Sequence, residues 1–164
     1  MSITTSTHRT GRSLVSHDLF HRLTDRIVKT ESFERDLAER IMDQALAFLL
    51  ACATNVGAPL APSELVDIGW HTFLLDTSEY ATFCDRAAGR FIHHVPNDNE
   101  HTGKSPDDVL ARTVTAMRTL GFHLDDALWP RTALSSCTGC HNGCHDDPPP
   151  TSQEDAQHAP QYLG

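Results

Sequence analysis

An apolar stripe of helical period in residues 33–54 constrains the fold more than any other feature of this sequence. Such side chains recur at three- and four-residue spacing, at Phe33, Leu37, Ile41, Ala45, Phe48, Leu49 and Cys52. Residues at that spacing share one face of an α-helix, whereas a half-buried strand needs strict alternation. Ser32 is a suitable N-cap. We therefore predict a helix from Ser32 to about Thr54 that forms the centre of the core.

Shorter segments on both sides of this stripe also carry helix signals. Leu19, Leu23 and Ile27 recur every four residues and predict a helix from Ser16 to about Lys29. Ser63 can cap a helix over residues 64–76. Both helices would pack their apolar faces on the central one.

Two further helices are predicted in the second half of the chain. Thr77 or Ser78 can cap the first, and Gly89 suits the left-handed position at its end. Ser105 and Pro106 are favourable residues for the start of the second, which would end at Gly121. A last short turn covers residues 124–129. No long alternating segment is present, so the predicted fold is all-α, with about five helices and one short extended segment at residues 91–96.

The composition of the chain ends differs from that of its middle. With 164 residues the chain is long enough for one domain. Residues 1–12 are rich in Ser and Thr and lack apolar periodicity, and residues 146–164 are rich in Pro and polar residues. We predict a disordered arm over 1–12, a helical domain over 13–131, a Cys/His segment over 132–145 and a disordered tail over 146–164.

Charge and hydropathy exclude some classes of partner. The formal net charge is −9 with histidine neutral, which argues against nucleic acid. The longest apolar run, residues 45–53, falls short of the roughly 18 residues needed to span a bilayer. Because no apolar signal segment follows the N-terminus, we predict a cytoplasmic protein with reduced cysteines. Its partner would be a small molecule or a protein of unknown identity.

Asp67 and His71 form the first candidate for a metal-binding pair. They are four residues apart in a predicted helix and would project from one face. They could be two ligands of one ion, or Asp67 could orient the imidazole of His71 through its second nitrogen. A simple pair on the helix surface is the alternative without function.

His93 and His94 are the second candidates. In an extended segment neighbouring side chains point to opposite sides, so one imidazole faces the core and the other faces away. The inward one needs a polar partner, which could be a metal, Asp67 or the Tyr80 hydroxyl. The sequence does not determine which of the two points inward.

Tyr80 and Cys84 share a predicted helix face and complete the candidate active site. Either could donate a proton or act as an additional ligand, although a free cysteine is more often a small core residue. His123 could approach the same region. Five other histidines lack a motif and are interpreted as solvated: His8, His17, His21, His101 and His158.

The residues from Trp70 to Pro96 carry a family resemblance. Trp70-His71, Tyr80, Phe83-Cys84 and the segment from Gly89 to Pro96 resemble the pattern of the glycine-rich-domain-containing-protein-like group of small actinobacterial proteins. The resemblance covers about residues 35–130 and implies a helical domain with Trp-His and His-His-x-Pro signatures. It implies no reaction. Where the name of that group suggests a glycine-rich tail, this chain has a short Cys/His cluster.

A dense cluster of metal-ligating residues follows the predicted helical domain. Its members are Cys137, Cys140, His141, Cys144 and His145. A Cys-x-x-Cys turn with a third cysteine and histidines can complete a tetrahedral zinc site, and thiolates also suit copper or iron–sulfur clusters. A c-type haem attachment and a dithiol redox pair are the rival interpretations.

Two functions from different classes follow from these clusters. The first is a metal-dependent enzyme, in which Asp67, His71 and His93 or His94 hold a transition metal. Zinc is favoured, and iron and copper also fit imidazole and carboxylate ligands. The second is a non-catalytic, zinc-stabilised interaction or metal-handling module. A third reading is a satisfied polar network inside a helical domain.

Overall fold

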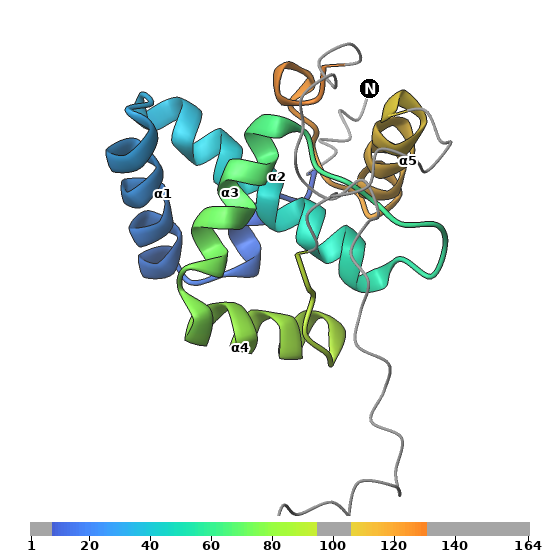
Figure 1. Cartoon of the computed structure of the whole chain (residues 1–164), viewed down its shortest axis with the longest axis horizontal. Coiled ribbons are helices and arrows are strands. Elements are labelled where there is room, and N and C mark those ends of the chain that lie inside the picture. Colours follow the sequence, from blue (N-terminus) through green and yellow to red (C-terminus); the bar gives the residue numbers. More distant parts are fainter. Residues whose placement is uncertain (1–7, 95–105, 131–164) are drawn as a thin grey trace, which may run out of the picture.

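The computed structural model describes residues 8–94 and 106–130 (Figure 1). Within these ranges the predicted all-α fold with five helices is confirmed. Two 3₁₀ turns, η1 and η2, accompany the helices. In chain order the elements are η1 (Gly11–Leu14), α1 (His17–Glu31), α2 (Arg35–Thr54), α3 (Glu64–Leu74), α4 (Thr77–Ala88), α5 (Pro106–Thr119) and η2 (Asp126–Leu128).

Helix α2 is the centre of the core. It contacts η1 and each of the other four helices, and in Figure 1 it passes between α1 and α5. The predicted stripe is buried from Ile41 to Cys52, and Met42, Leu46 and Ala47 on other faces are buried as well. A helix that is apolar on most of its circumference is one that neighbours surround. The apolar stripe therefore identified the central helix correctly, but more of the circumference of this helix is buried than the stripe predicted.

The helix ends agree with the sequence at Ser16, Ser63 and Gly89, the last of which ends α4 in a left-handed conformation. They differ at Ser32 and at the start of α4, where Asp76 and not Thr77 or Ser78 is the N-cap. The side chains of Ser16 and Ser63 accept hydrogen bonds from the backbone N–H groups of Leu19 and Val66, as N-caps do. Ser32 does not begin α2. It ends α1 in a left-handed conformation with φ of 56°, and α2 begins after Glu34. A polar residue between two helices suits either role, so the sequence alone was ambiguous there.

Residues 8–12 were expected in the disordered arm, whereas the structure packs them onto the helical domain. Arg9 forms a parallel bridge with Phe122, and its backbone N–H donates to the Gly121 carbonyl at 2.9 Å. Gly11 is buried against α2 so closely that a Cβ there would lie 1.8 Å from the Asp43 carbonyl oxygen. Only glycine permits this approach, which gives the segment its place on α2.

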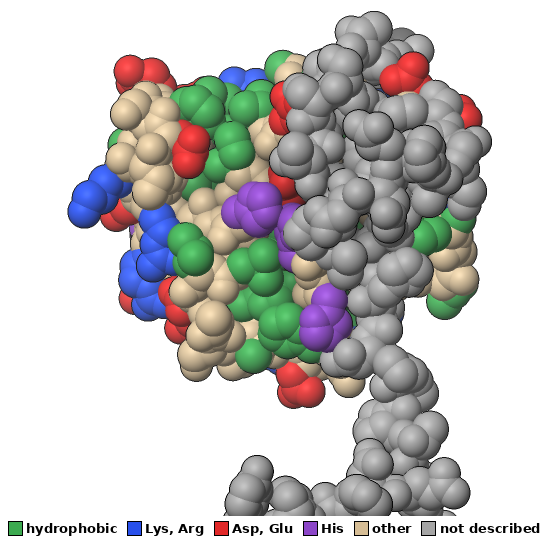
Figure 2. All heavy atoms as spheres, in the orientation of Figure 1, with side chains coloured by type: hydrophobic (Ala, Val, Ile, Leu, Met, Phe, Trp, Pro, Cys, Tyr) green, Lys and Arg blue, Asp and Glu red, His purple; other side chains and the backbone are tan. Residues whose placement is uncertain are grey.

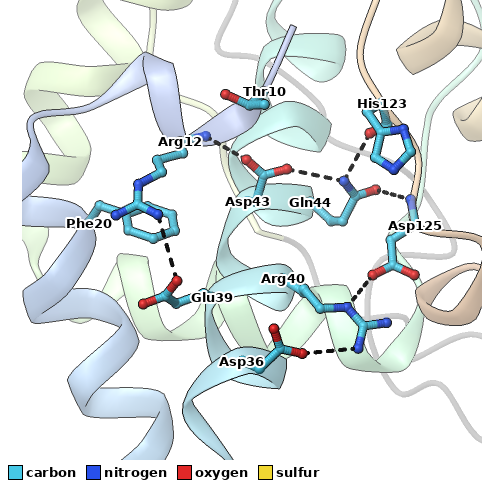
Figure 3. Close-up of a pocket in the computed structure, with 10 residues that line it drawn as sticks. All are labelled: Thr10, Arg12, Phe20, Asp36, Glu39, Arg40, Asp43, Gln44, His123 and Asp125. Carbon is cyan, nitrogen blue, oxygen red and sulfur yellow. Dashed lines mark hydrogen bonds and ion pairs between the residues drawn. The ribbon is translucent and has the colours of Figure 1, made fainter. Parts of the chain in front are cut away.

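Polar side chains of α2 form hydrogen bonds and an ion pair with the segment that follows α5 (Figure 3). The Gln44 side chain donates to the His123 carbonyl at 3.0 Å and accepts from the Trp129 indole at 2.8 Å. Arg40 pairs with Asp125 at 2.5 Å. A pocket of about 440 Å³ lies here, and its charged side chains pair with one another or with the backbone. These polar residues therefore hold two segments of the chain together.

Lowering the pH should weaken the ion pair between Arg40 and Asp125. The hydrogen bond from Arg40 lowers the pKa of Asp125, aided by the charge of Arg40 and the Ala127 N–H. A lowered pKa stabilises the fold fully above the unfolded value of about 3.9, and that contribution is lost as pH falls through the folded value. We expect Asp125→Asn to reduce the free energy of unfolding at pH 6 and to have a smaller effect near pH 3. Urea unfolding at both pH values measures this.

The neighbouring Asp126 is the matched control, since its side chain is 90% exposed. Asp126→Asn should change stability little at either pH. An equal effect of Asp125→Asn at pH 6 and pH 3 would contradict the assignment of this ion pair.

Helices α2 and α3 pack closely against each other at Gly69. A Cβ at this position would lie 2.6 Å from the Ala45 Cβ and 3.2 Å from Ile41 Cγ2. Both neighbours belong to α2 and are buried. Glycine in the middle of a helix costs about 1 kcal/mol relative to alanine, so its presence here reflects close packing.

Replacing Gly69 should therefore destabilise the fold. We expect Gly69→Ala to lower the free energy of unfolding by about 1 kcal/mol or more, because the overpacking outweighs the gain in helix propensity. Adding Ala45→Gly should recover part of that loss. Gly57→Ala is the control, since its Cβ would meet only Asn55 Oδ1 at 3.5 Å. If chemical denaturation shows Gly69→Ala to be stabilised, the helices are not in contact at this residue.

Candidate metal centre

Asp67 is the central residue of the candidate site. It lies on α3, its side chain is 10% exposed, and its two carboxylate oxygens face two different histidines. Oδ1 is 3.0 Å from His94 Nε2, and Oδ2 is 3.6 Å from His71 Nδ1. His71 follows one helical turn later on the same face, as the four-residue spacing predicted. The carboxylate therefore joins α3 to the segment after α4.

His94 is the histidine that faces Asp67, although both neighbouring histidines are partly buried and the Nε2 atom of His93 is buried as well. Its side chain is 8% exposed, and its ring lies 4.4 Å from the Trp70 ring and 4.3 Å from the His71 ring, centroid to centroid. Trp70 thus forms an apolar wall against one imidazole of the site. His93, by contrast, has its ring 4.9 Å from that of Phe91.

The segment that carries His94 is held in place by Tyr80. The Tyr80 hydroxyl accepts from the Trp70 indole N–H at 2.9 Å and donates to the Ile92 carbonyl at 2.6 Å. All three residues are fully buried. This connection from Trp70 on α3 through Tyr80 on α4 to Ile92 positions the backbone two residues before His94. The site thus depends on the core, although its ligands lie at the edge of it.

Three ligand atoms converge at this place. One atom each from Asp67, His71 and His94 lies within 4.8 Å of the other two, and among the described residues these are the three that could share a metal ion. Two imidazoles and one carboxylate suit zinc, iron or copper. The second interpretation also fits, in which Asp67 accepts from both imidazoles and orients them.

The site is open on the side of His71. The side chain of His71 is 56% exposed, and Figure 2 shows histidine side chains at the surface over α3. A hollow of about 180 Å³ lies beside it, lined by residues of α1 and α3 that include Arg26, Thr30 and Glu31. A small molecule or water could therefore reach an ion at this centre from one side.

The remaining predicted site residues lie elsewhere. His93 is not part of the converging group, Tyr80 occupies the buried position described above, and Cys84 is buried at 1% exposure. The candidate ligands Cys137, Cys140, His141, Cys144 and His145 lie outside the described residues. The sequence did not predict the role of Trp70 as a wall of the site, because adjacency to His71 says nothing about a contact with His94.

Comparison with known proteins places this domain in a family. The sequence model of the UCP032817-like family matches residues 10–119, which is more than half of the chain. The chain belongs to the UCP032817-like family. All three converging residues lie inside the matched span, and the Cys/His cluster lies beyond it. The resemblance to the glycine-rich-domain-containing group stays a prediction, since the family match does not test it.

Comparison with curated proteins and with solved structures adds no further relative. No curated protein matches the chain, and no solved structure matches it. No helix among residues 8–94 and 106–130 is both long and apolar enough to cross a membrane.

The Tyr80 hydrogen bonds should matter for both stability and metal binding. Tyr80→Phe leaves the Trp70 N–H and the Ile92 carbonyl buried without this partner, so we expect a loss of about 1–3 kcal/mol in the free energy of unfolding. Thr82→Ala on the same helix removes an exposed hydroxyl and should cost much less. Chemical denaturation of both variants measures the difference. Equal stabilities would show that the hydroxyl does not anchor the segment.

Proposed function

We propose that this chain is a transition-metal-binding protein whose ion is held by Asp67, His71 and His94. The observation that carries the proposal is the convergence of three ligand atoms within 4.8 Å, from segments 27 residues apart in sequence. Zinc is the favoured ion, and iron or copper would also fit this donor set. The Cys/His cluster at residues 137–145 would form a separate, thiolate-rich site.

The burial of Asp67 supports this assignment. The whole residue is 7% exposed, and a buried carboxylate is costly unless a positive charge or hydrogen bonds compensate it. The two imidazoles that face its oxygens can compensate it as protonated partners or together with a bound cation. In the second case both imidazoles are neutral and their nitrogens are available as ligands.

The accessibility of His71 favours a catalytic use of the ion. Three protein ligands leave a coordination position free, as catalytic zinc sites do, whereas structural sites are closed by four. An ion there would act as a Lewis acid or lower the pKa of a bound water. The Trp70 ring would shield one side of the ion from water, and the packing around His94 would hold this ligand in place. The hollow beside His71 would leave the ion accessible from the other side. We assign Tyr80 the task of positioning the His94 segment, and Cys84 a place in the core.

A non-catalytic role is the second candidate, and a specific contact favours it. The bond between Asp67 and His94 ties residues 91–94 to α3. An ion at the same place would strengthen that connection, so its main effect could be to stabilise the domain. The two roles differ in whether the bound ion takes part in a reaction or only stabilises the domain.

Metal content of the full-length chain tests the proposal. We expect about one zinc ion per chain to be lost in His71→Ala, whose exposed side chain can be removed without disturbing the core, and also in Asp67→Asn. His123→Ala, an exposed histidine outside the group, should keep it. The affinity should fall by more than the about 10- to 100-fold that loss of an outer-shell partner causes. Elemental analysis and competition with a chelator measure both quantities.

Replacing Cys137, Cys140 and Cys144 together separates the two clusters. If only this triple variant loses metal, the core site is not a metal centre and the module interpretation prevails. If the chain as isolated carries no metal and a chelator leaves its melting temperature unchanged, both metal proposals fail. Metal that is retained in the triple variant, and that water or a small anion can reach, supports the catalytic proposal.

A further inference from the structure

A pair of histidines on α1 lies outside the centre described above. His17 and His21 are one helical turn apart, and their Nε2 atoms form a hydrogen bond of 2.9 Å, in which one ring N–H donates to the other ring nitrogen. The rings lie 4.2 Å apart at an angle of 61°; His17 is exposed and His21 is partly buried. From the sequence we interpreted both as solvated histidines. Their four-residue spacing in a predicted helix was the signal that could have identified them as a pair.

We propose that His17 and His21 form a second metal site, specific for an ion that prefers imidazole nitrogens at right angles. Metal–nitrogen bonds of about 2.05 Å at 90° place two nitrogens about 2.9 Å apart. The hydrogen bond between the two Nε2 atoms already holds them at this separation, and a bound ion would take the place of its proton. Square-planar or tetragonal coordination is typical of Cu²⁺ and Ni²⁺. Tetrahedral zinc would need the nitrogens farther apart.

The helix holds this pair firmly. Helix α1 is anchored by Leu19, Phe20 and Leu23, which are buried, and the Ser16 side chain caps its first turn. The ring of His21 also meets the Phe20 ring edge-on, with centroids 6.1 Å apart. Because the backbone is fixed, little conformational freedom is lost when both imidazoles bind one ion, which is the basis of a chelate.

Neighbouring groups orient the ring nitrogens. The Arg12 guanidinium donates to His21 Nε2 at 3.2 Å, so this nitrogen carries a lone pair when the imidazole is neutral. Asp18 Oδ1 lies 3.8 Å from His17 Nδ1, on the side where the ring proton must sit when Nε2 binds an ion. At 3.8 Å, with the Asp18 side chain 94% exposed, this is a charge contact and not a hydrogen bond, and its negative charge favours a bound cation.

Arg12 also opposes binding. Its positive charge lies beside the ligand nitrogen of His21, and a divalent ion would have to displace its hydrogen bond. The guanidinium has other contacts, with the Phe20 ring at 4.5 Å and with Glu39 at 3.6 Å. Removing its charge should therefore strengthen metal binding without unfolding the helix. This site does not depend on the Asp67 centre, because the two share no ligand.

The test uses the full-length chain with Cys137, Cys140 and Cys144 replaced by Ser, so that thiolates do not compete. Ni²⁺ is titrated by calorimetry, and protection of single histidines from acylation is read by mass spectrometry. We expect Ni²⁺ to protect His17 and His21 but not His8, which is exposed and whose ring lies 5.9 Å from that of His123. His17→Ala should lower the affinity of this site about 100-fold, the loss expected when a chelate becomes a single ligand.

Two further variants complete the design. Arg12→Met retains an apolar stem over Phe20 and should raise the affinity several-fold, whereas His71→Ala should leave protection of His17 and His21 unchanged. Equal reactivity of His17 and His21 with and without Ni²⁺ would overturn the proposal. So would equal affinities in His17→Ala and His8→Ala. Failure of the Asp67 centre alone would appear as a zinc content that His71→Ala does not lower, with the protection of His17 and His21 by Ni²⁺ unaffected, so the two proposals are distinguishable.

Discussion

The close contact between α2 and α3 at Gly69 is the constraint on which the rest of the site depends. Successive helix residues are about 100° apart, so the residues two positions before and two after Gly69 point roughly opposite to it. Those residues are Asp67 and His71. Seating Gly69 against Ala45 and Ile41 therefore turns the carboxylate and the imidazole away from α2. A small residue on one side of α3 and polar residues on the other are two consequences of one packing arrangement.

Asp67, on the side of α3 opposite Gly69, would be exposed to water if no other segment packed over it. The segment at residues 91–94 covers it, and that segment is held by the Tyr80 hydroxyl and the Trp70 indole. The same arrangement brings His94 against the Trp70 ring and onto the Asp67 carboxylate. Two buried hydrogen bonds in the core thus decide the position of a polar group at its edge. An ordinary helix-surface pair has no such support, and this distinguishes Asp67 and His71 from one.

Most of the fold could be predicted from periodicity and caps. The stripe from Leu37 to Cys52 identified the central helix, because a helix buried on several faces must be apolar at almost every turn. Ser16 and Ser63 were recognisable because short hydroxyl side chains satisfy free N–H groups at helix starts. Ser32 misled for the same reason, since a polar residue between two helices can end one or begin the next. Residues 8–12 were missed because their order comes from a backbone bridge to Phe122 and from a buried glycine, neither of which has a local pattern.

By itself the sequence determined the helices, the pairing of Asp67 with His71, and the proximity of one further histidine. These follow from local geometry, because positions four apart on a helix share a face and adjacent positions in an extended segment do not. Only the tertiary structure decided that His94 is the histidine that faces Asp67 and that Tyr80 belongs to the support of the site. Both depend on contacts between α3, α4 and the segment after it. Such contacts join residues far apart in the sequence, so no local sequence pattern predicts which side chains come within bonding distance.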